Sequence, residues 1–454
     1  MNIEYIAILF VLTTFGFLLS GFPVAFVLSG TSLIFAYFGI IFDVFDYSYL
    51  LAFPNRVYGI MVNQNLLAVP LFIFMGSVLE KTDIAENLLK SMNQLYKNSS
   101  SGLGISVIIV GTLMAASTGI VGASVVTLGL LSLPVMLKNG YPPSLACGTI
   151  CASGTLGQII PPSLVLILLA DVLSSAYQQA QLNAGIFSPD TITIGDLFAG
   201  AIIPGLLLPI LYIFYIKSKK IKINKNNDKG INETNSANLL KSILPPFILI
   251  FLVLGSIIFG IATPSEAAAV GAAGSLSIAF LKGKFTKNIL EKTSRETIKI
   301  TSMVFMILLG ATLFSLVFRG FEGELLIHNL LVEIPSDKYT SLLIVLILMF
   351  FLGFILDFIE IIFIVIPLFG PTLFSLGFDP IWIGILIAMV LQTSFLTPPF
   401  GFSLFYLRGV TPKNISTSEI YNGVYPFIGI QILVIIIIYQ FPSMTTFLPE
   451  FLFG

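Results

Sequence analysis

Apolar segments of about 20 residues recur along most of this chain. A segment of that length lets one α-helix cross the roughly 30 Å hydrocarbon core of a bilayer. Of the 454 residues, 56% are hydrophobic and 10% are charged, whereas soluble domains carry about 25% charged residues. The runs of Ile, Leu and Val lack the alternation that an outer-membrane barrel requires. The sequence therefore predicts an all-α polytopic membrane protein with about ten to twelve spans.

Charge and cysteine content argue against several other classes of function. The 22 Lys and Arg nearly balance the 23 Asp and Glu, and no basic block is large enough to indicate nucleic-acid binding. Cys147 and Cys151 lie one helical turn apart in an apolar stretch, so we expect small core residues rather than a metal or redox pair. No nucleophile, base or metal cluster is visible. The sequence predicts neither an enzyme nor an organic cofactor, and the expected partners are membrane proteins, lipid and small solutes.

The chain divides into two related halves. Residues 217–241 are polar and rich in Lys, as is typical of a cytoplasmic linker. A shift of 237 residues places Pro134 on Pro371, Gly140 on Gly377, Pro161 on Pro398 and Pro162 on Pro399, with no gap across that stretch. A shift of 241 places Pro23 on Pro264 and Gly30 on Gly271. Many secondary transporters consist of such repeats. We therefore predict one repeat over residues 1–216 and a second over residues 242–454.

Loop charges indicate that the two repeats are inverted. Lys and Arg accumulate on the cytoplasmic side of membrane proteins. Residues 81–100 carry three Lys, whereas the matching segment 319–339 is rich in Glu. Residues 171–196 carry three Asp and no base, whereas the counterpart beginning near Arg408 includes Lys413. These sign changes predict opposite orientations, with the linker inside and both chain ends outside.

Gly, Ser and Pro interrupt the apolar segments at matched places in the two halves. We expect hairpin 1 near residues 103–137, a broken helix over 144–171 interrupted at 154–163, hairpin 2 near residues 340–376 interrupted at 353–360, and a broken helix over 381–408 interrupted at 393–401. An unpaired backbone group costs several kcal/mol in a bilayer, so such breaks occur where they face protein or water. Unwound carbonyls and half-helix ends can bind ions. The alternative is that Gly and Ser only allow close helix packing.

A few ionisable side chains stand out in this apolar sequence. Asp357 and Glu360 lie three residues apart, and ionisable groups inside a membrane segment are functional hypotheses by default. Two roles stay open for them, coupling to a proton or cation and capping of a helix end. Thr263 to Glu266 has the pattern of a capping box, which favours a structural role for Glu266. His328 lies in a segment that we expect to be an external loop, as a solvated residue.

Four motifs together resemble a known family. They are Leu67-Ala68-Val69-Pro70-Leu71-Phe72, the Gly140-Tyr141 turn followed by Ile160-Pro161-Pro162-Ser163, Ala262-Thr263-Pro264-Ser265-Glu266-Ala267-Ala268-Ala269-Val270-Gly271, and Thr397-Pro398-Pro399-Phe400-Gly401. With them, nearly the whole chain resembles the large membrane subunit of tripartite ATP-independent periplasmic transporters, called TRAP transporters. The resemblance implies the fold of the ion-transporter superfamily, an inverted repeat with two re-entrant hairpins, and a transport domain that moves like an elevator against a scaffold.

The resemblance also implies a function, a location and partners. It implies sodium-driven import of a carboxylate or similar small organic anion across the bacterial inner membrane. A periplasmic solute-binding protein would deliver the substrate. A small membrane subunit of about four helices would complete the complex, as a separate polypeptide. Sodium is then the only metal ion expected.

Family motifs carry two sodium sites over to this sequence. One would use Ser117, Thr118, Gly157, Ile160 and Pro162, in part through backbone carbonyls, and the other Gly353, Ser394, Thr397 and Phe400. Residues expected near the substrate are Gly119, Ser163, Asp357 and Pro398. Where many family members have a Ser-rich tip, this chain reads Gly119-Ile120-Val121-Gly122, so its substrate contacts should differ. The closest alternative is a binding-protein-independent transporter of the divalent-anion or arsenite type. An ion channel stays open as a further class.

Overall fold

The computed structural model describes residues 3–82, 101–119, 121–219, 221, 236–333 and 337–453. Every regular element in these ranges is helical, as predicted. Within them, seven helices are long and apolar enough to cross a bilayer, or eight if the bent pair Ser48–Val62 and Asn65–Glu80 forms one span. Six further apolar helices have 10–17 residues. The predicted ten to twelve spans stay a prediction, because several of these shorter apolar helices are close to the length of a crossing.

The helices of the first half precede a polar segment that lies largely outside the described residues. They are α1 (Ile3–Leu19), α2 (Val24–Ile41), α3 (Ser48–Leu51), α4 (Phe53–Val62), α5 (Ala68–Glu80), α7 (Gly102–Thr118), α8 (Val121–Lys138), α9 (Pro143–Thr155), α10 (Leu164–Asn183) and α11 (Ile194–Ser218). Short 3-10 turns occur at Asn65–Leu67 and Leu156–Gln158.

The helices of the second half lie within residues 236–333 and 337–453, and they follow one another in an order similar to that of the first half. Its helices are α12 (Ser236–Ile258), α13 (Pro264–Leu281), α14 (Lys287–Gly320), α15 (Gly323–Glu333), α16 (Lys338–Leu352), α17 (Phe358–Ser375), α18 (Pro380–Leu396), α19 (Phe402–Val410), α20 (Thr417–Gln440) and α21 (Ser443–Phe453). The starts of α8 and α9 plus 237 residues coincide with the starts of α17 and α18. The repeat spacing therefore recurs in the helix bounds, whereas the inverted orientation in a membrane stays a prediction.

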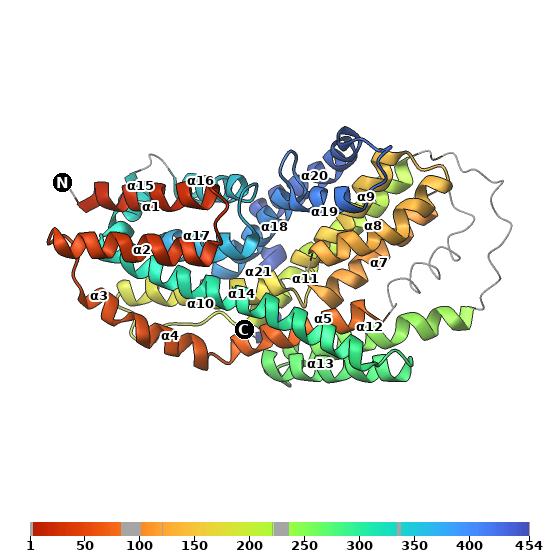
Figure 1. The fold of residues 1–454 in the computed structure, drawn as a ribbon, viewed down its shortest axis with the longest axis horizontal. Coiled ribbons are helices and arrows are strands. Elements are labelled where there is room, and N and C mark those ends of the chain that lie inside the picture. Colours follow the sequence, from red (N-terminus) through yellow and green to blue (C-terminus); the bar gives the residue numbers. More distant parts are fainter. Residues whose placement is uncertain are drawn as a thin grey trace.

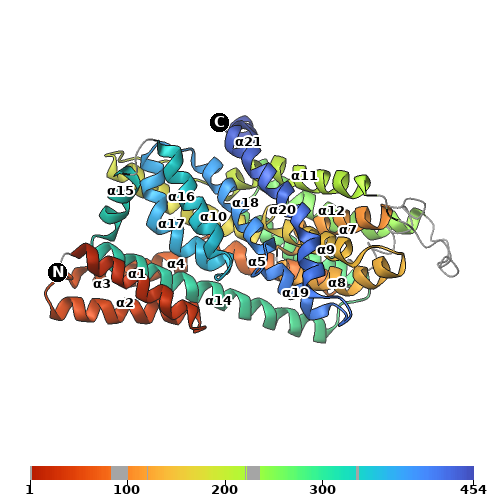
Figure 2. The ribbon, with the colours of Figure 1, turned by 90° about the horizontal axis from the view of Figure 1, so that it is seen from above.

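Helices from the two halves pack across one another. The pairs α10 with α17, α8 with α19 and α9 with α20 are in contact. The second arm of each broken helix therefore lies against the second helix of the other half's hairpin. The two helix hairpins, α7–α8 and α16–α17, lie towards opposite ends of the long axis (Figure 1). Helix α14 has 34 residues, a length of roughly 50 Å, and runs along one side of the molecule against α2, α5 and α17 (Figure 2).

Capping residues begin several of the helices. Thr263 and Glu266 form the predicted capping box at the start of α13, so the structural role of Glu266 is confirmed. The expectation of a loop around His328 was wrong, because this residue lies within α15, although its side chain is exposed as predicted. Cys147 and Cys151 are free and buried, which confirms them as core residues.

The tightest helix contact predicts a sensitivity to side-chain volume. A Cβ added at Gly148 in α9 would lie 2.0 Å from the carbonyl oxygen of Gly423 in α20. Backbone atoms cannot rotate away, so we expect Gly148→Ala to destabilise the fold by about 1–3 kcal/mol, measured by denaturant unfolding in detergent micelles. The control is Gly429→Ala, also in α20, where no atom lies within 4 Å of the added Cβ. Equal stability of the two variants would contradict the close packing of α9 and α20.

Candidate functional site

The first broken helix opens between α9 and α10. After the 3-10 turn at Leu156–Gln158, the chain is non-helical until α10 begins at Leu164. This break falls within the interruption predicted at 154–163. The Ser163 hydroxyl donates a 2.7 Å hydrogen bond to the carbonyl oxygen of Gln158 and so closes the turn. The Pro161-Pro162 peptide bond is cis.

The tip of the first hairpin lies against this break. Helix α7 ends at Thr118, and Gly119 follows in a left-handed conformation with φ of 61°. A Cβ on Gly119 would lie 3.6 Å from the Pro162 carbonyl oxygen, and one on Gly157 would lie 3.6 Å from the Cα of Ala115. The structure therefore places Gly119 beside Pro162 and Gly157 beside Ala115 of α7. The ion-binding role of Gly157 and Pro162 and the substrate role of Gly119 stay predictions.

Ser117, Thr118 and Ile160 are the other three residues predicted for the first sodium site. Ser117 and Thr118 are the last residues of α7, and their side chains lie outside the described part of the structure. Ile160 is buried in the break, and its side chain faces Gly205 of α11, whose added Cβ would lie 3.5 Å from Ile160 Cγ1. Any contribution of Ile160 to an ion site would therefore come from its carbonyl group.

The second broken helix opens after α18. The helix continues through Thr393 and Ser394 to Leu396, so the interruption predicted at 393–401 began four residues too early. The Ser394 hydroxyl donates to the Leu391 carbonyl oxygen, and the Thr397 hydroxyl donates to that of Thr393, both at 2.7 Å. Such bonds let hydroxyl residues remain helical, which explains the shifted boundary.

The second hairpin tip meets the second broken helix. Gly353 caps the end of α16, and a Cβ there would lie 2.1 Å from Ser394 Oγ. Two predicted residues, Gly353 and Ser394, are therefore in contact, and Thr397 lies about one helical turn beyond Ser394. Pro398 and Phe400 lie in the following break, where the side chain of Phe400 is 52% exposed. The structure does not bring the ring of Phe400 into the contact between Gly353 and Ser394.

Asp357 and Glu360 form a capping box at the start of α17. Asp357 Oδ1 accepts a 2.7 Å hydrogen bond from the Phe358 N–H, and Glu360 Oε2 accepts a 3.1 Å bond from the Asp357 N–H. Of the two roles left open by the sequence, capping is confirmed. A direct part of either carboxylate in coupling stays a prediction.

Two buried glutamines near the breaks were missed by sequence reasoning. Gln158 lies in the 3-10 turn and Gln392 in α18, and both are fully buried. Within the ranges that the structure describes, neither side-chain amide has a hydrogen-bond partner. Leaving such a group unpaired costs about 1–3 kcal/mol, so both amides are available to water or to an ion. The signal in the sequence was a single amide side chain inside each apolar segment.

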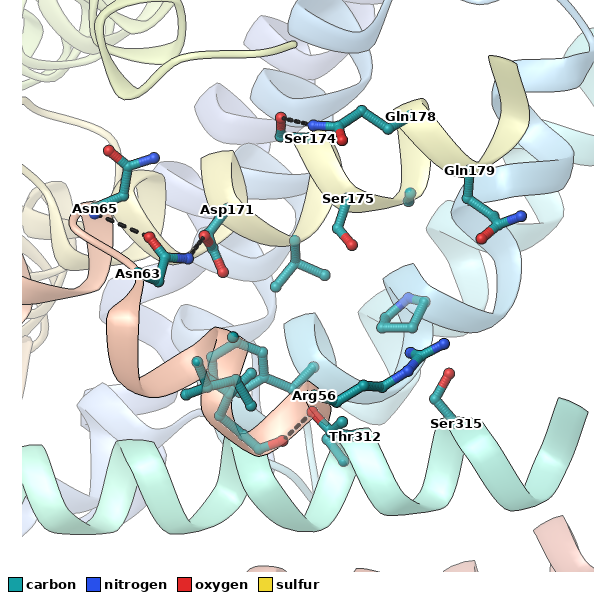
Figure 3. Close-up of a pocket in the computed structure, with 18 of the residues that line it drawn as sticks. Arg56, Asn63, Asn65, Asp171, Ser174, Ser175, Gln178, Gln179, Thr312 and Ser315 are labelled. Carbon is teal, nitrogen blue, oxygen red and sulfur yellow. Dashed lines mark hydrogen bonds between the residues drawn. The ribbon is translucent and has the colours of Figure 1, made fainter. Parts of the chain in front are cut away.

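A polar cavity of about 770 Å³ lies among α4, α10, α14 and α17. Asp171, Ser174, Ser175, Gln178 and Gln179 line it from α10, and Arg56, Thr312 and Ser315 lie on the opposite side (Figure 3). The lining includes none of the predicted sodium residues whose side chains are described. The signal that sequence reasoning missed is the helical spacing of the polar residues of α10.

Asn63 connects the α4 side of this cavity to α10. It follows α4 at the 56° bend of the helix pair Ser48–Val62 and Asn65–Glu80. Its Nδ2 donates a 2.6 Å hydrogen bond to Oδ1 of Asp171, and its Oδ1 accepts a 2.9 Å bond from the Asn65 N–H. A single amide therefore fixes the bend and holds the Asp171 carboxylate.

Comparison with known proteins identifies the family. Residues 11–444 match the model of the family described as "Tripartite ATP-independent periplasmic transporter, DctM component". The chain belongs to this family. It is therefore a TRAP transporter large permease and a multi-pass membrane protein, as the sequence motifs indicated. The sequence predicted that this chain is not an enzyme, and the named relatives are transporter permeases.

Two curated relatives of this TRAP permease come from Vibrio cholerae serotype O1. The "C4-dicarboxylate TRAP transporter large permease protein DctM" is 28% identical, and the match covers 99% of this chain and 98% of that protein. The "Sialic acid TRAP transporter large permease protein SiaM" is 27% identical, with 97% of each covered. Among solved structures, the Alcanivorax borkumensis YdaH transporter has a TM-score of 0.63 at 16% identity and covers 87% of this chain and 90% of its own. That likeness concerns the fold alone.

The contact between Gly353 and Ser394 in this TRAP permease is testable by a double-mutant cycle. Gly353 has φ of −65°, so alanine is conformationally acceptable and only the clash matters. We expect Gly353→Ala to destabilise by about 1–3 kcal/mol, and Ser394→Gly to remove most of that loss, measured by unfolding in micelles. The control is Gly409→Ala in α19, where an added Cβ meets nothing within 4 Å. Additive effects of Gly353→Ala and Ser394→Gly would refute the contact.

The hydrogen bond from Asn63 to Asp171 predicts a second coupling. Asn63→Ala removes the donor of a partly buried carboxylate, so we expect a loss of about 1–3 kcal/mol of stability. Asn63→Ala combined with Asp171→Ala should cost less than the sum of the single changes. Asn65→Ala is the control, since it keeps the backbone N–H that donates to Asn63 Oδ1. A loss in Asn65→Ala as large as in Asn63→Ala would contradict this account.

Proposed function

We propose that this chain is the translocating subunit of a sodium-coupled importer of a small organic anion, in the bacterial inner membrane. One observation carries the proposal. Each helix hairpin ends against a broken helix, with Gly119 beside Pro162 in one half and Gly353 beside Ser394 in the other. The same 237-residue spacing relates the two pairs of elements.

The chemistry of the two breaks suits a sodium ion. Both offer backbone carbonyls and hydroxyl groups, which are the hard oxygen donors that a monovalent cation prefers. The first sodium site would use Ser117, Thr118, Gly157, Ile160 and Pro162, and the second Gly353, Ser394, Thr397 and Phe400. At the second site, Ser394 and Thr397 each donate their hydroxyl hydrogen to a carbonyl of the same helix. Their lone pairs are therefore free to face a cation.

The substrate would bind between the two hairpin tips, near Gly119, Ser163, Asp357 and Pro398. The N-termini of α10 and α19 follow the two breaks, and a helix N-terminus favours an anion. Sodium ions bound beside these helix N-termini would add positive charge and so favour an anion further. Two relatives are named for C4-dicarboxylate and sialic acid. A carboxylate is therefore the substrate class that we propose.

Transport would follow an elevator mechanism. The hairpins and broken helices pack across the two halves, through α10 with α17 and α8 with α19, and such a body can move as a unit. The remaining helices would form the scaffold. A small membrane subunit of about four helices and a periplasmic solute-binding protein would complete the transporter, as the family name implies.

The decisive experiment is uptake into proteoliposomes that contain this subunit and the small subunit. We expect accumulation of a labelled C4-dicarboxylate or another carboxylate only with both a sodium gradient and the binding protein. Uptake that persists without a sodium gradient would contradict the coupling. Uptake without the binding protein would favour the divalent-anion or arsenite type of transporter instead.

Thr397 and Thr411 form a matched pair for the mutational arm of this experiment. Each caps the end of its helix, and each hydroxyl donates a 2.7 Å bond to the carbonyl four residues earlier. Only Thr397 lies at a proposed sodium site. We expect Thr397→Ala to raise the sodium concentration for half-maximal uptake about tenfold, equal to about 1.4 kcal/mol, and Thr411→Ala to leave it unchanged. The same shift in both variants would argue against ligation by Thr397.

A further inference from the structure

The polar cavity between α4, α10, α14 and α17 is unusual for so apolar a chain. Five polar side chains face it from α10, at spacings of three and four residues, and they form one continuous helix face (Figure 3). Polar and ionisable groups of membrane helices face protein partners or water-filled paths, because lipid cannot solvate them. The volume of about 770 Å³ lies within the usual range of small-molecule sites, about 300–1,000 Å³.

Four charged side chains line the cavity, and two of them form an ion pair with each other. Arg319 forms an ion pair with Glu324 at 2.6 Å. The carboxylate of Asp171 accepts a hydrogen bond from the side-chain amide of Asn63. Arg56, on α4, makes no ion pair with any residue in the described ranges. Arg56 is therefore the cationic side chain of the lining that an anionic ligand can reach without breaking an ion pair, and Asp171 is a carboxylate that such a ligand must avoid.

We propose that this cavity is a second binding site for a small organic anion, in which Arg56 binds the anionic group and the polar face of α10 binds its oxygen atoms. Ser175 is exposed to the cavity, and a guanidinium can bind a carboxylate through two parallel hydrogen bonds. The choice of a carboxylate rests on the proposed function. The cavity itself is separate from the hairpin tips, because it contains neither Gly119 nor Gly353.

The predicted topology places this site on the periplasmic side. The end of α10, the end of α14 and the start of α15 all lie in segments that are expected to be outside, and all three contribute lining residues. An anion released by a binding protein would therefore meet Arg56 before it reaches the hairpin tips. A positive charge in a recessed polar site raises the local concentration of anions.

Thiol labelling tests the site without measuring transport. The native Cys147 and Cys151 are buried, so Ser175→Cys introduces a thiol inside the cavity. The probes are an anionic and a cationic methanethiosulfonate reagent of similar size. We expect Arg56→Gln in the same background to lower the ratio of the anionic rate to the cationic rate about tenfold. Succinate should slow labelling, whereas its neutral analogue succinamide should not.

Two controls make the outcome decisive. Ser443 lies at the exposed start of α21, outside the cavity. The ratio of the two labelling rates at Ser443→Cys should therefore not respond to Arg56→Gln. Ser315→Cys repeats the measurement from α14 if Ser175→Cys does not fold. A ratio unaffected by Arg56→Gln, no reaction at either cavity position, or no protection by succinate would each overturn the proposal.

The result is separable from the test of the proposed function. Sodium-dependent uptake together with failed labelling would remove the second site and leave the coupling intact. Charge-selective labelling with succinate protection, together with sodium-independent uptake, would keep the site and remove the coupling.

Discussion

The hydrogen-bonding requirement of the backbone is the constraint on which this structure depends. A helix that crosses lipid satisfies its own carbonyl and N–H groups, whereas a helix that stops halfway exposes several of them. This chain stops twice at matched places, and each stop is closed by a serine hydroxyl. Ser163 donates to the Gln158 carbonyl oxygen, and Ser403 donates to that of Phe395. The breaks are therefore stable local structures in which other carbonyls remain available to a ligand.

Glycine then allows the hairpins to cover these breaks. A side chain at Gly353 would overlap Ser394, and a Cβ at Gly119 would lie only 3.3 Å from the backbone nitrogen of Leu164. Close approach of this kind excludes lipid and water from the exposed backbone. This close approach also explains why the sequence alone could not decide whether the Gly and Ser residues serve helix packing or ion binding. The same small residues that permit contact between helices also leave carbonyl groups within reach of a small cation, so the two interpretations describe one arrangement.

Much of the fold could be predicted because hydropathy and Gly-Pro spacing act locally. The break at 154–163, the capping box at Glu266 and the burial of Cys147 follow from short sequence patterns. The second break was placed too early, because Thr393 and Ser394 bond back to their own helix and do not interrupt it. The cavity was missed for a different reason. Arg56 and Asp171 are far apart in the chain and line one cavity because Asn63, at the bend after α4, bonds to Asp171. No local sequence pattern reports such a tertiary contact.

The two proposed anion sites differ in the kind of charge that they offer, and this difference bears on the direction of transport. Arg56 carries a full, permanent charge, so it can attract an anion whether or not sodium is present. Apart from the capping carboxylates Asp357 and Glu360, the hairpin tips would offer helix dipoles, equivalent to about half a charge each, until sodium ions bind beside them. An anion would therefore gain by moving from Arg56 to the tips only when sodium occupies its sites. Coupling would then arise at the transfer between the two sites, before any movement of the transport domain.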